Sequence, residues 1–305
     1  MLLAIGGPTG TGKSAAALDI AEELSRRGTA AEVVNADAMQ LYRGMDIGTA
    51  KLALAERRGV PHHMLDVLDV TEQASVAAYQ QQARRHIESI AARGRIPILV
   101  GGTGLYMHSV LYRMAFPGTD REIREYWEAQ RDDIGSSRLH LVLRQRDPAA
   151  AAAIAPSDGR RIVRALEVGD LTGRRFSEFT AWANTPWCEA RVLVMDQPQD
   201  ALAETLHRRA EDMWDRGVLA ETRMLVRRGL IRESTAGKAI GYAQALAVLA
   251  GTLTEAAARA ETARATVRYA RRQRTWFRRY RHAQWLEYVQ LDPAAQADAV
   301  LSALP

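Results

Sequence analysis

The sequence predicts an α/β protein in which a parallel sheet is flanked by helices and interrupted by a helical insertion domain. Short apolar runs at residues 2–5, 31–35 and 96–100 have the length of buried strands, and helical patterns separate them. From about residue 116 to residue 190, charged helical patterns replace such runs, until a strand returns at 191–195. We therefore expect a core built from residues 1–115 and 191–305, with the insertion domain at 116–190.

The first strand runs directly into a phosphate-binding loop that matches G-x-x-x-x-G-K-[ST]. Its glycines let the backbone approach an anion, and the helix that follows adds the positive end of its dipole. Lys13 supplies a positive charge, and the Ser14 hydroxyl can hold a magnesium ion (Mg2+) that shares the phosphate oxygens. A glycine-rich turn with a solvent-facing lysine is the alternative. The motif predicts a P-loop NTPase-like core that binds a diphosphate or triphosphate. The expected phosphate-binding residues are Gly7, Pro8, Thr9, Gly10, Thr11, Gly12, Lys13 and Ser14.

Composition favours a cytoplasmic protein. The chain of 305 residues is 47% hydrophobic and 25% charged, as in ordinary soluble proteins. No apolar run approaches the roughly 20 residues of a membrane span, so no membrane partner is expected. Because the first predicted strand begins at residue 2, no signal peptide is expected. Cys188 is the single cysteine, which excludes a disulfide framework. No coiled-coil heptad is present, so a monomer is expected.

The second predicted strand, 31–35, delivers Asp37 to the sheet edge that holds the phosphate loop. A polar, glycine-broken segment continues to Lys51 and is expected to form a loop over the site. The strand at 96–100 ends in Gly101-Gly102-Thr103, without the magnesium-binding aspartate that phosphate-loop ATPases usually carry. We therefore expect a loop that holds a phosphorylated group without the usual hydrolysis machinery. Adjacent His62 and His63 are expected to be structural or substrate-orienting, since nearby residues supply no third and fourth metal ligands.

Further helices are expected along the rest of the chain, and the last of them is rich in arginine and aromatic residues. Arginine mixed with aromatic residues suits a phosphate backbone and stacked bases, whereas a solvated helix face is the alternative. The helices are expected at 74–93, 120–132, 136–145, 148–154, from Asp158, and at 200–216, 218–228, 237–250 and 254–281. The basic residues between 264 and 281 are Arg264, Arg268, Arg271, Arg272, Arg274, Arg278, Arg279 and Arg281, with Tyr269, Trp276, Phe277 and Tyr280 among them.

Several stretches together resemble the tRNA dimethylallyltransferase family, also called tRNA isopentenyltransferases. The resemblance spans nearly the whole chain, and the string Met45–Lys51 is far more specific than the phosphate loop. The stretches are Gly7–Ser14, the Asp37-containing segment through Lys51, Gly101–Tyr106, Arg161–Glu167, Lys238–Tyr242 and Tyr269–Arg278. The family fold implied is a phosphate-loop core with a helical insertion that clasps the anticodon stem.

The resemblance implies transfer of a dimethylallyl group from dimethylallyl diphosphate to N6 of an adenosine, with diphosphate leaving. The implied target is the adenosine immediately 3′ of the anticodon in tRNAs that read codons beginning with U (UNN codons). The implied partners are the tRNA anticodon stem-loop and dimethylallyl diphosphate, with Mg2+ as cofactor. Because the adenine amine is a weak nucleophile, the reaction needs a base and charge stabilisation on the leaving group.

Asp37 and Thr103 are the expected catalytic residues. Asp37 is the acid placed at a strand end beside the phosphate loop, so we expect it to be the base; capping a helix is its alternative role. Thr103 resembles the family threonine that hydrogen-bonds the oxygen bridging the donor carbon and phosphate, and capping its own helix is the rival role. Lys238 is expected to gather charge on the diphosphate together with the phosphate loop.

Family positions also imply contacts with tRNA. The adenosine pocket would be lined by Asp37, Ala38, Met39 and Gln40. Further tRNA contacts are implied for Arg124, Arg160, Arg161, Ile162, Val163, Arg164, Lys238, Ala239, Ile240, Gly241, Tyr242 and Ala243. Three positions depart from the family pattern: Ala38 replaces a common serine, Lys238 stands where some relatives have arginine, and Val267-Arg268 replaces Arg-Gln.

Three other functions are compatible with parts of the sequence. A kinase that uses ATP would need a second magnesium-binding acid, which the 96–100 strand does not supply. An isopentenyltransferase acting on free adenine nucleotide would not need the arginine-rich helix and the insertion. A non-catalytic RNA-binding protein would not need Asp37 and Thr103 beside the phosphate loop. The sequence therefore favours the tRNA-modifying transferase.

Overall fold

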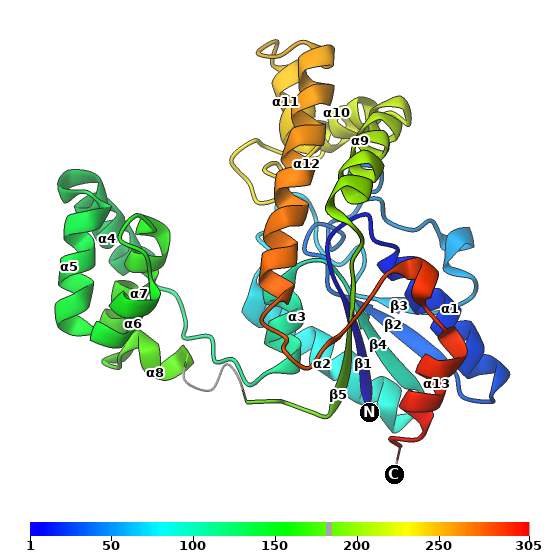
Figure 1. Cartoon of the computed structure of the whole chain (residues 1–305). Helices are drawn as coiled ribbons and strands as arrows, with labels where there is room; N and C mark the ends of the chain where they lie inside the picture. The colour runs from blue at the N-terminus through cyan, green and yellow to red at the C-terminus, as the bar shows by residue number, and fades with distance from the viewer. Residues whose placement is uncertain (181–184, 305) are drawn as a thin grey trace. The chain divides into compact units, whose positions relative to one another are not determined.

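A computed structural model of the chain describes residues 1–180 and 185–304, and the chain divides into two compact units (Figure 1). The first unit consists of Met1–Leu111 and the chain from Cys188 onward, and the second is Tyr112–Trp187. A bridge between Tyr112 and Pro186 and a hydrogen bond from the Arg113 N–H to the Thr185 carbonyl (2.8 Å) join the two ends of the second unit. Its bounds therefore fall slightly before the expected 116–190 at both ends.

The first unit is built on a six-stranded parallel sheet with the order β3-β2-β4-β1-β5-β6. The sheet confirms the expected fold class, and its strands β1, β2, β4 and β5 fall where apolar runs predicted them. Strands β3 and β6 are additional. The strand bounds are β1 (Leu2–Gly6), β2 (Ala31–Asn35), β3 (His62–His63), β4 (Ile96–Val100), β5 (Ala190–Met195) and β6 (Gln284–Leu286).

Helices cover both faces of this sheet. Helix α1 (Lys13–Arg26) and helix α13 (Pro293–Leu301) share one apolar core with the sheet, in which Ile20, Ile98 and Val300 are fully buried. Helices α2 (Val76–Ala92) and α3 (Gly104–Leu111) contact β2, β4 and β1 from the other face, as Figure 1 shows. Burial on both faces explains why these strands read as continuous apolar runs.

Four helices and the segment after β2 form a second core within the first unit. Helix α11 begins at Tyr242, after turns and bends over residues 232–241, so the helix expected from 237 is shorter than predicted. The helices are α9 (Gln199–Asp215), α10 (Val218–Arg227), α11 (Tyr242–Leu249) and α12 (Glu255–Phe277). Their shared core includes Tyr42, Met45, Met213, Trp214 and Tyr242, so it joins the helices to the loop that follows Asp37.

All regular elements of the second unit are helices, over the residues that the structure describes. Trp127, Leu139, Leu143 and Leu166 form its core, and Asp158 caps α7 by accepting the Arg161 N–H (3.2 Å), as expected. Its helices are α4 (Arg121–Ile134), α5 (Ser136–Arg146), α6 (Pro148–Ala153), α7 (Gly159–Thr172) and α8 (Phe176–Thr180). Two short 3-10 helices in the first unit, η1 (Leu54–Arg57) and η2 (Tyr288–Gln290), complete the described elements. Over residues 1–180 and 185–304, no helix is long and apolar enough to cross a lipid bilayer.

Candidate active site

The phosphate loop lies between β1 and α1 at the carboxyl edge of the sheet. Gly7, Gly10 and Gly12 have φ values of 133°, 85° and 81°, which side chains with a Cβ rarely adopt. Gly7 also has no room for a side chain, because a Cβ there would lie 2.1 Å from the Met195 carbonyl oxygen. Helix α1 has neither a side-chain cap nor an acid in its first turn. Its first N–H groups are therefore directed to the place where an anion can bind.

Two cationic side chains meet at this loop. Lys13 donates a hydrogen bond to the Pro8 carbonyl, and Arg209 on α9 donates to the Thr9 hydroxyl (3.1 Å). Burial, followed by the charge of Arg209, lowers the pKa of Lys13 to about 7, while Asp37 opposes the shift. Burial also lowers the pKa of Arg209. The site therefore holds positive charge that an anionic ligand would stabilise.

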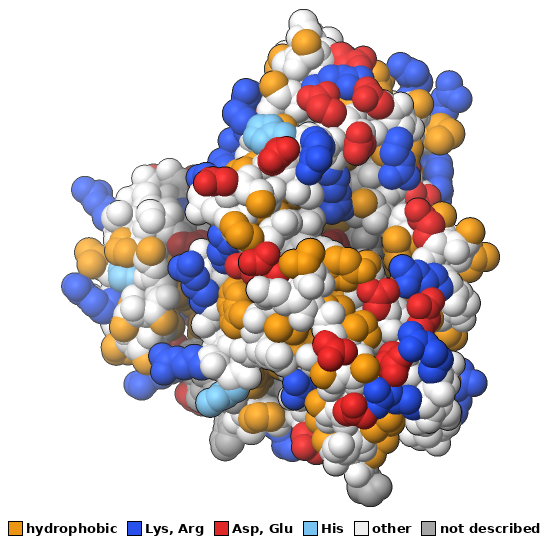
Figure 2. All heavy atoms as spheres, turned by 45° about the vertical axis from the view of Figure 1, so that its right-hand side comes forward, with side chains coloured by type: hydrophobic (Ala, Val, Ile, Leu, Met, Phe, Trp, Pro, Cys, Tyr) orange, Lys and Arg blue, Asp and Glu red, His pale blue; other side chains and the backbone are white. Residues whose placement is uncertain are grey.

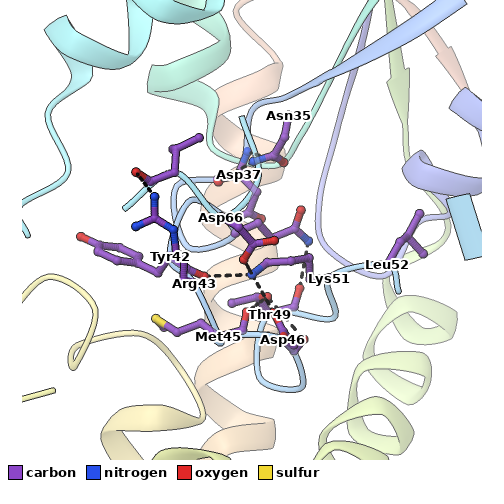
Figure 3. Close-up of polar contacts among 12 residues, drawn as sticks. Asn35, Asp37, Tyr42, Arg43, Met45, Asp46, Thr49, Lys51, Leu52 and Asp66 are labelled. Carbon is purple, nitrogen blue, oxygen red and sulfur yellow. Dashed lines mark hydrogen bonds and ion pairs between the residues drawn. The ribbon is translucent and has the colours of Figure 1, made fainter. Parts of the chain in front are cut away.

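Asp37 is held in place by the residues around it. The Asn35 amide accepts the Asp37 N–H (3.1 Å) and donates to the Asp37 carbonyl (3.0 Å) and to the Met64 carbonyl (3.0 Å). One carboxylate oxygen of Asp37 accepts the Met39 N–H (2.9 Å), which is a local turn contact and not a helix cap. Figure 3 shows Asn35 and Asp37 next to each other above the loop that continues to Lys51. These contacts fix the direction of the carboxylate.

Thr103 lies next to Asp37 because the turn after β4 approaches the end of β2. The Thr103 N–H donates to the Ala36 carbonyl (3.2 Å), and the Thr103 hydroxyl accepts the Ala38 N–H (3.0 Å). Gly101 permits this approach, since a Cβ there would lie 2.2 Å from the Ala36 backbone. The Thr103 hydroxyl therefore contacts the loop that carries Asp37, and it also interacts with the Tyr269 side chain.

The Met45–Lys51 string forms a loop with buried polar anchors. Lys51 donates to the Tyr42 carbonyl (2.9 Å), to Asp46 (2.7 Å) and to Asp66 (2.6 Å), as Figure 3 shows. From the other side, buried Glu221 on α10 accepts the Ile47 N–H (2.9 Å) and the Tyr242 hydroxyl (2.5 Å). Burial, then the Glu221 charge, raises the pKa of Tyr242 well above its usual range.

Two cavities of about 350 and 360 Å³ meet at Asp37. The first contains the phosphate loop, with Lys13, Ser14 and Gly102 among its lining residues, and also Gln40 and His62. The second is lined by Met39, Lys238, Ala239, Ile240, Tyr269 and Arg272. Both are lined by Thr9, Asp37, Thr49 and Arg209. Burial, followed by the charge of Asp37, raises the pKa of Tyr269 to about 12, while contacts with Thr103 and Gln273 oppose the shift.

The histidine pair contacts neighbouring protein groups in the first unit. His63 contacts buried Glu32 (2.6 Å), and the His62 ring contacts the Val60 carbonyl (2.8 Å). Among residues 1–180 and 185–304, no group of three or more His, Cys, Asp or Glu side chains could hold a metal ion. His62 therefore enters the site as a lining residue of the phosphate-loop cavity.

The expected tRNA-contact residues divide by burial. Arg160, Arg161 and Lys238 are exposed, Ile240 and Ala243 are half-buried, and Ala38, Ala239 and Gly241 are buried. Ile162, Val163 and Tyr242 belong to apolar cores. Arg124 and Arg164 both form ion pairs with fully buried Glu167 at 3.0 Å. Part of their positive charge is therefore neutralised within the second unit.

The arginine-rich helix is less uniform than the sequence indicated. Glu261 pairs with Arg264 and Arg268, Phe277 and Tyr280 are buried, and the Arg279 guanidinium stacks on Trp276 at 3.7 Å. Basic and acidic side chains are interspersed over the upper helices in Figure 2. One example is Arg259, which pairs with Glu211, Asp215 and Glu255. Exposed arginines remain at Arg271, Arg272 and Arg278.

Sequence patterns missed three polar residues of the site: Arg209, Gln273 and Glu221. Each lies inside a helical pattern on α9, α12 or α10, and each reaches the site only through the packing of its helix. Gln273 falls within the Tyr269–Arg278 stretch, so that stretch was the available signal for it. Arg209 and Glu221 belong to no motif.

Comparison with known proteins assigns the family. The sequence model described as IPP transferase matches residues 40–280. A tRNA dimethylallyltransferase of Clavibacter sepedonicus is 54% identical over 94% of this chain and 93% of that protein. A protein of the same name from Mycobacterium tuberculosis is 52% identical over 93% of this chain and 91% of that protein.

Solved structures agree with the sequence matches. The tRNA isopentenylpyrophosphate transferase of Bacillus halodurans is 36% identical, with a TM-score of 0.70 over 99% of this chain and 94% of that chain. A eukaryotic dimethylallyltransferase acting on tRNA is 27% identical, with a TM-score of 0.82 over 100% of this chain and 80% of that chain. This chain belongs to the IPP transferase family, together with the tRNA dimethylallyltransferases.

Proposed function

We propose that this chain transfers a dimethylallyl group from dimethylallyl diphosphate to N6 of the adenosine immediately 3′ of the anticodon, in tRNAs that read UNN codons. The observation that carries the proposal is the meeting of two cavities at Asp37. One cavity contains the phosphate loop and suits the diphosphate, while Tyr269 and Arg272 line the other and suit a base and its backbone.

Asp37 is the proposed general base. Its carboxylate lies between the two cavities and takes a proton from N6 as the nitrogen attacks the allylic carbon of the donor. The new bond joins N6 to this carbon, and the bond from the carbon to the bridging oxygen breaks. The electron pair of the broken carbon–oxygen bond leaves with the diphosphate. Because the Met39 N–H and Asn35 hold the residue in place, the carboxylate is oriented before the substrates arrive.

Stabilisation of the leaving diphosphate is assigned to the phosphate loop and the cations around it. Lys13, Arg209 and the loop N–H groups would bind the phosphate oxygens, with Lys238 at the wall of the adjoining cavity. The Thr103 hydroxyl would donate its proton to the bridging oxygen, since it already accepts the Ala38 N–H.

Magnesium fits this arrangement as a partner of the substrate phosphates. The Ser14 hydroxyl is exposed at the start of α1 and lines the same cavity as Lys13. A hydroxyl is a hard oxygen ligand, so Ser14 would hold the ion together with phosphate oxygens of the substrate. The ion would supply additional positive charge for the leaving group.

The proposed tRNA contacts fall to the exposed positions first. Arg160, Arg161, Lys238 and Arg272 can neutralise phosphates without losing a buried partner. Met39 and Ile240 would surround the target base in the second cavity, beside Asp37, while Gln40 would approach the base from the phosphate-loop cavity. The remaining expected contacts in the Arg160–Arg164 and Lys238–Ala243 stretches would act through the backbone or by holding these side chains.

The reaction can be tested with isotope-labelled dimethylallyl diphosphate and Mg2+, offered with unmodified tRNA or with AMP. We expect label in tRNA, none in a tRNA whose target adenosine is replaced by guanosine, and a loss of about 100-fold or more for Asp37→Asn. The amide oxygen of this variant would still accept the Met39 N–H, so the loop should keep its shape. Label in AMP alone would support a nucleotide isopentenyltransferase. Transfer from labelled ATP, with none from the allylic donor, would support a kinase.

A further inference from the structure

Gln273 on the arginine-rich helix α12 joins two loops of the active site with one side chain. Its Oε1 accepts the Thr9 N–H in the phosphate loop (2.9 Å), and its Nε2 donates to the Gly102 carbonyl (2.8 Å). The side chain is only 4% exposed, so water does not compete for either bond. Gln273 therefore ties the phosphate loop to the turn that carries Thr103.

Both ends of the Gln273 amide are specified by what they contact. The Thr9 N–H can only donate and the Gly102 carbonyl can only accept, so the oxygen and nitrogen of the amide have one possible orientation. The space is also fixed, since a Cβ on Gly102 would lie 2.3 Å from Gln273 Nε2. An ionised glutamate lacks the donor, and methionine lacks both functions.

The two loops would contact different parts of the leaving diphosphate. In the proposed reaction, the phosphate loop binds the diphosphate and Thr103 contacts the bridging oxygen. Their separation must match the donor to within a fraction of an ångström for the Thr103 proton to reach that oxygen. We propose that Gln273 is a positioning residue that holds Thr103 at the correct place relative to the bound diphosphate. This inference rests on the proposed function of Thr103.

A second glutamine provides a matched contrast. Gln197 also donates to the phosphate loop, through a bond to the Gly10 carbonyl (3.0 Å). It reaches the loop from the segment after β5, and this bond does not involve the turn that carries Thr103. Gln197→Leu should therefore affect binding of the diphosphate without changing the contribution of Thr103.

The first test measures kcat and KM for Gln273→Met and Gln273→Glu, with thermal melting to check the fold. We expect kcat to fall about 10- to 100-fold for both at pH 8, while KM for dimethylallyl diphosphate changes much less. A protonated glutamic acid can donate to the Gly102 carbonyl and accept the Thr9 N–H, as the native amide does. The kcat ratio of Gln273→Glu to wild type should therefore rise between pH 8 and pH 5.5, whereas the ratio for Gln273→Met should stay level.

The second test combines Gln273→Met with Thr103→Ala. If Gln273 acts through Thr103, the methionine variant should lower kcat by less than about 3-fold once the hydroxyl is absent. Equal losses in both backgrounds, or a level pH ratio for Gln273→Glu, would overturn the inference. If Gln273→Met fails to fold, the pH ratio of Gln273→Glu decides alone. A full kcat for Thr103→Ala by itself would instead contradict the proposed role of Thr103, whatever Gln273 does. Gln197→Leu should add its effect independently of Thr103.

Discussion

The Thr103 hydroxyl accepts the backbone N–H of Ala38 at 3.0 Å, which joins the turn after β4 to the residue that follows Asp37. This bond uses an acceptor position of the hydroxyl, so its single proton can be donated to Tyr269, which also interacts with Thr103, or to a bound substrate. Because the contact is made by the Ala38 backbone, it does not depend on which side chain occupies that position. The replacement of a serine by Ala38 therefore leaves this link between the two catalytic candidates intact.

Substitution of Thr103 should separate its hydroxyl from its methyl group. Thr103→Ala removes the proton donor and should lower kcat about 100- to 1000-fold, as for loss of one oxyanion-type donor. Thr103→Ser keeps the hydroxyl and should retain most of kcat. The rate at which labelled dimethylallyl is transferred to tRNA in a single turnover measures the loss in each of the two variants. Equal losses in the two variants would contradict a role for the hydroxyl.

Binding of diphosphate should take up a proton through Lys13. Its pKa is lowered to about 7 in the free protein, so above pH 7 the amine is largely neutral. A bound phosphate favours the ammonium form and raises this pKa, so affinity should fall by up to about tenfold per pH unit above pH 7. Calorimetry in buffers of different ionisation enthalpy measures the proton. The Lys13→Met variant should bind diphosphate weakly and take up fewer protons on binding. Equal proton uptake by the variant and the wild type would assign the proton to another group.

Two adjacent arginines on α9 offer a matched pair. Arg209 lines both cavities and contacts Thr9, whereas Arg208 is exposed. Arg209→Gln should weaken diphosphate binding about 10- to 100-fold, which corresponds to a charged hydrogen bond. It should also raise the pKa of Lys13, because the Arg209 charge helps to lower it. Arg208→Gln should change neither quantity; the same loss in both variants would indicate a general charge effect.

The Tyr242–Glu221 contact should matter for stability. Tyr242→Phe removes the hydroxyl that donates to Glu221 at 2.5 Å, so a buried carboxylate loses one partner. The free energy of unfolding should fall by about 1.5–3 kcal/mol in urea titrations. Tyr126→Phe, at a tyrosine that is 56% exposed, serves as the control and should change it by less than about 0.5 kcal/mol. A loss of unfolding free energy for Tyr242→Phe as small as the loss for Tyr126→Phe would mean that water replaces the hydroxyl.

Glu32 should give the fold a defined acid dependence. Burial alone would raise its pKa, but hydrogen bonds from Arg93, His63 and Arg95 outweigh it and lower the pKa to about 2. A carboxyl whose folded pKa is lowered stabilises the fold above its unfolded pKa, and this stabilisation is lost as pH falls from 4.5 through 2. Glu32→Gln should therefore reduce the free energy of unfolding by about 3 kcal/mol at pH 7. The difference in the free energy of unfolding between Glu32→Gln and wild type should shrink towards pH 2. A difference that stays constant with pH would exclude this linkage.

The parts of the site that the sequence could predict are those whose function is local. The phosphate loop, Asp37 and Thr103 each follow a strand, so their place at the sheet edge is determined by three or four neighbouring residues. Arg209 and Gln273 are different, because they enter the site only when α9 and α12 pack against each other and against the loops at the sheet edge. No spacing within either helix indicates which of its polar residues will be directed to the phosphate loop.

Three local predictions differed for identifiable physical reasons. The helix expected from residue 237 begins at Tyr242, because Gly241 adopts φ 92° and interrupts the helical backbone. Strands β3 and β6 contain two and three residues, too few for a periodic pattern. The aromatic residues Phe277 and Tyr280 are buried with Ala270 and Gln273. Their helical spacing of three or four residues was the signal for an inward face that composition alone concealed.

The segment after α12 determines when the phosphate loop gains its full support during synthesis of the chain. Strand β6 extends the sheet, α13 packs against α1, and the Tyr288 hydroxyl donates to Asp19 on α1 (2.6 Å). The Tyr288 ring also lies close to Gly12, 3.0 Å from where a Cβ would be. Tyr288 and Asp19 are 269 positions apart in the sequence, so the residues that support the phosphate loop leave the ribosome well after the loop itself. A nascent chain should therefore bind the diphosphate tightly only after the segment from β6 to α13 has been synthesised.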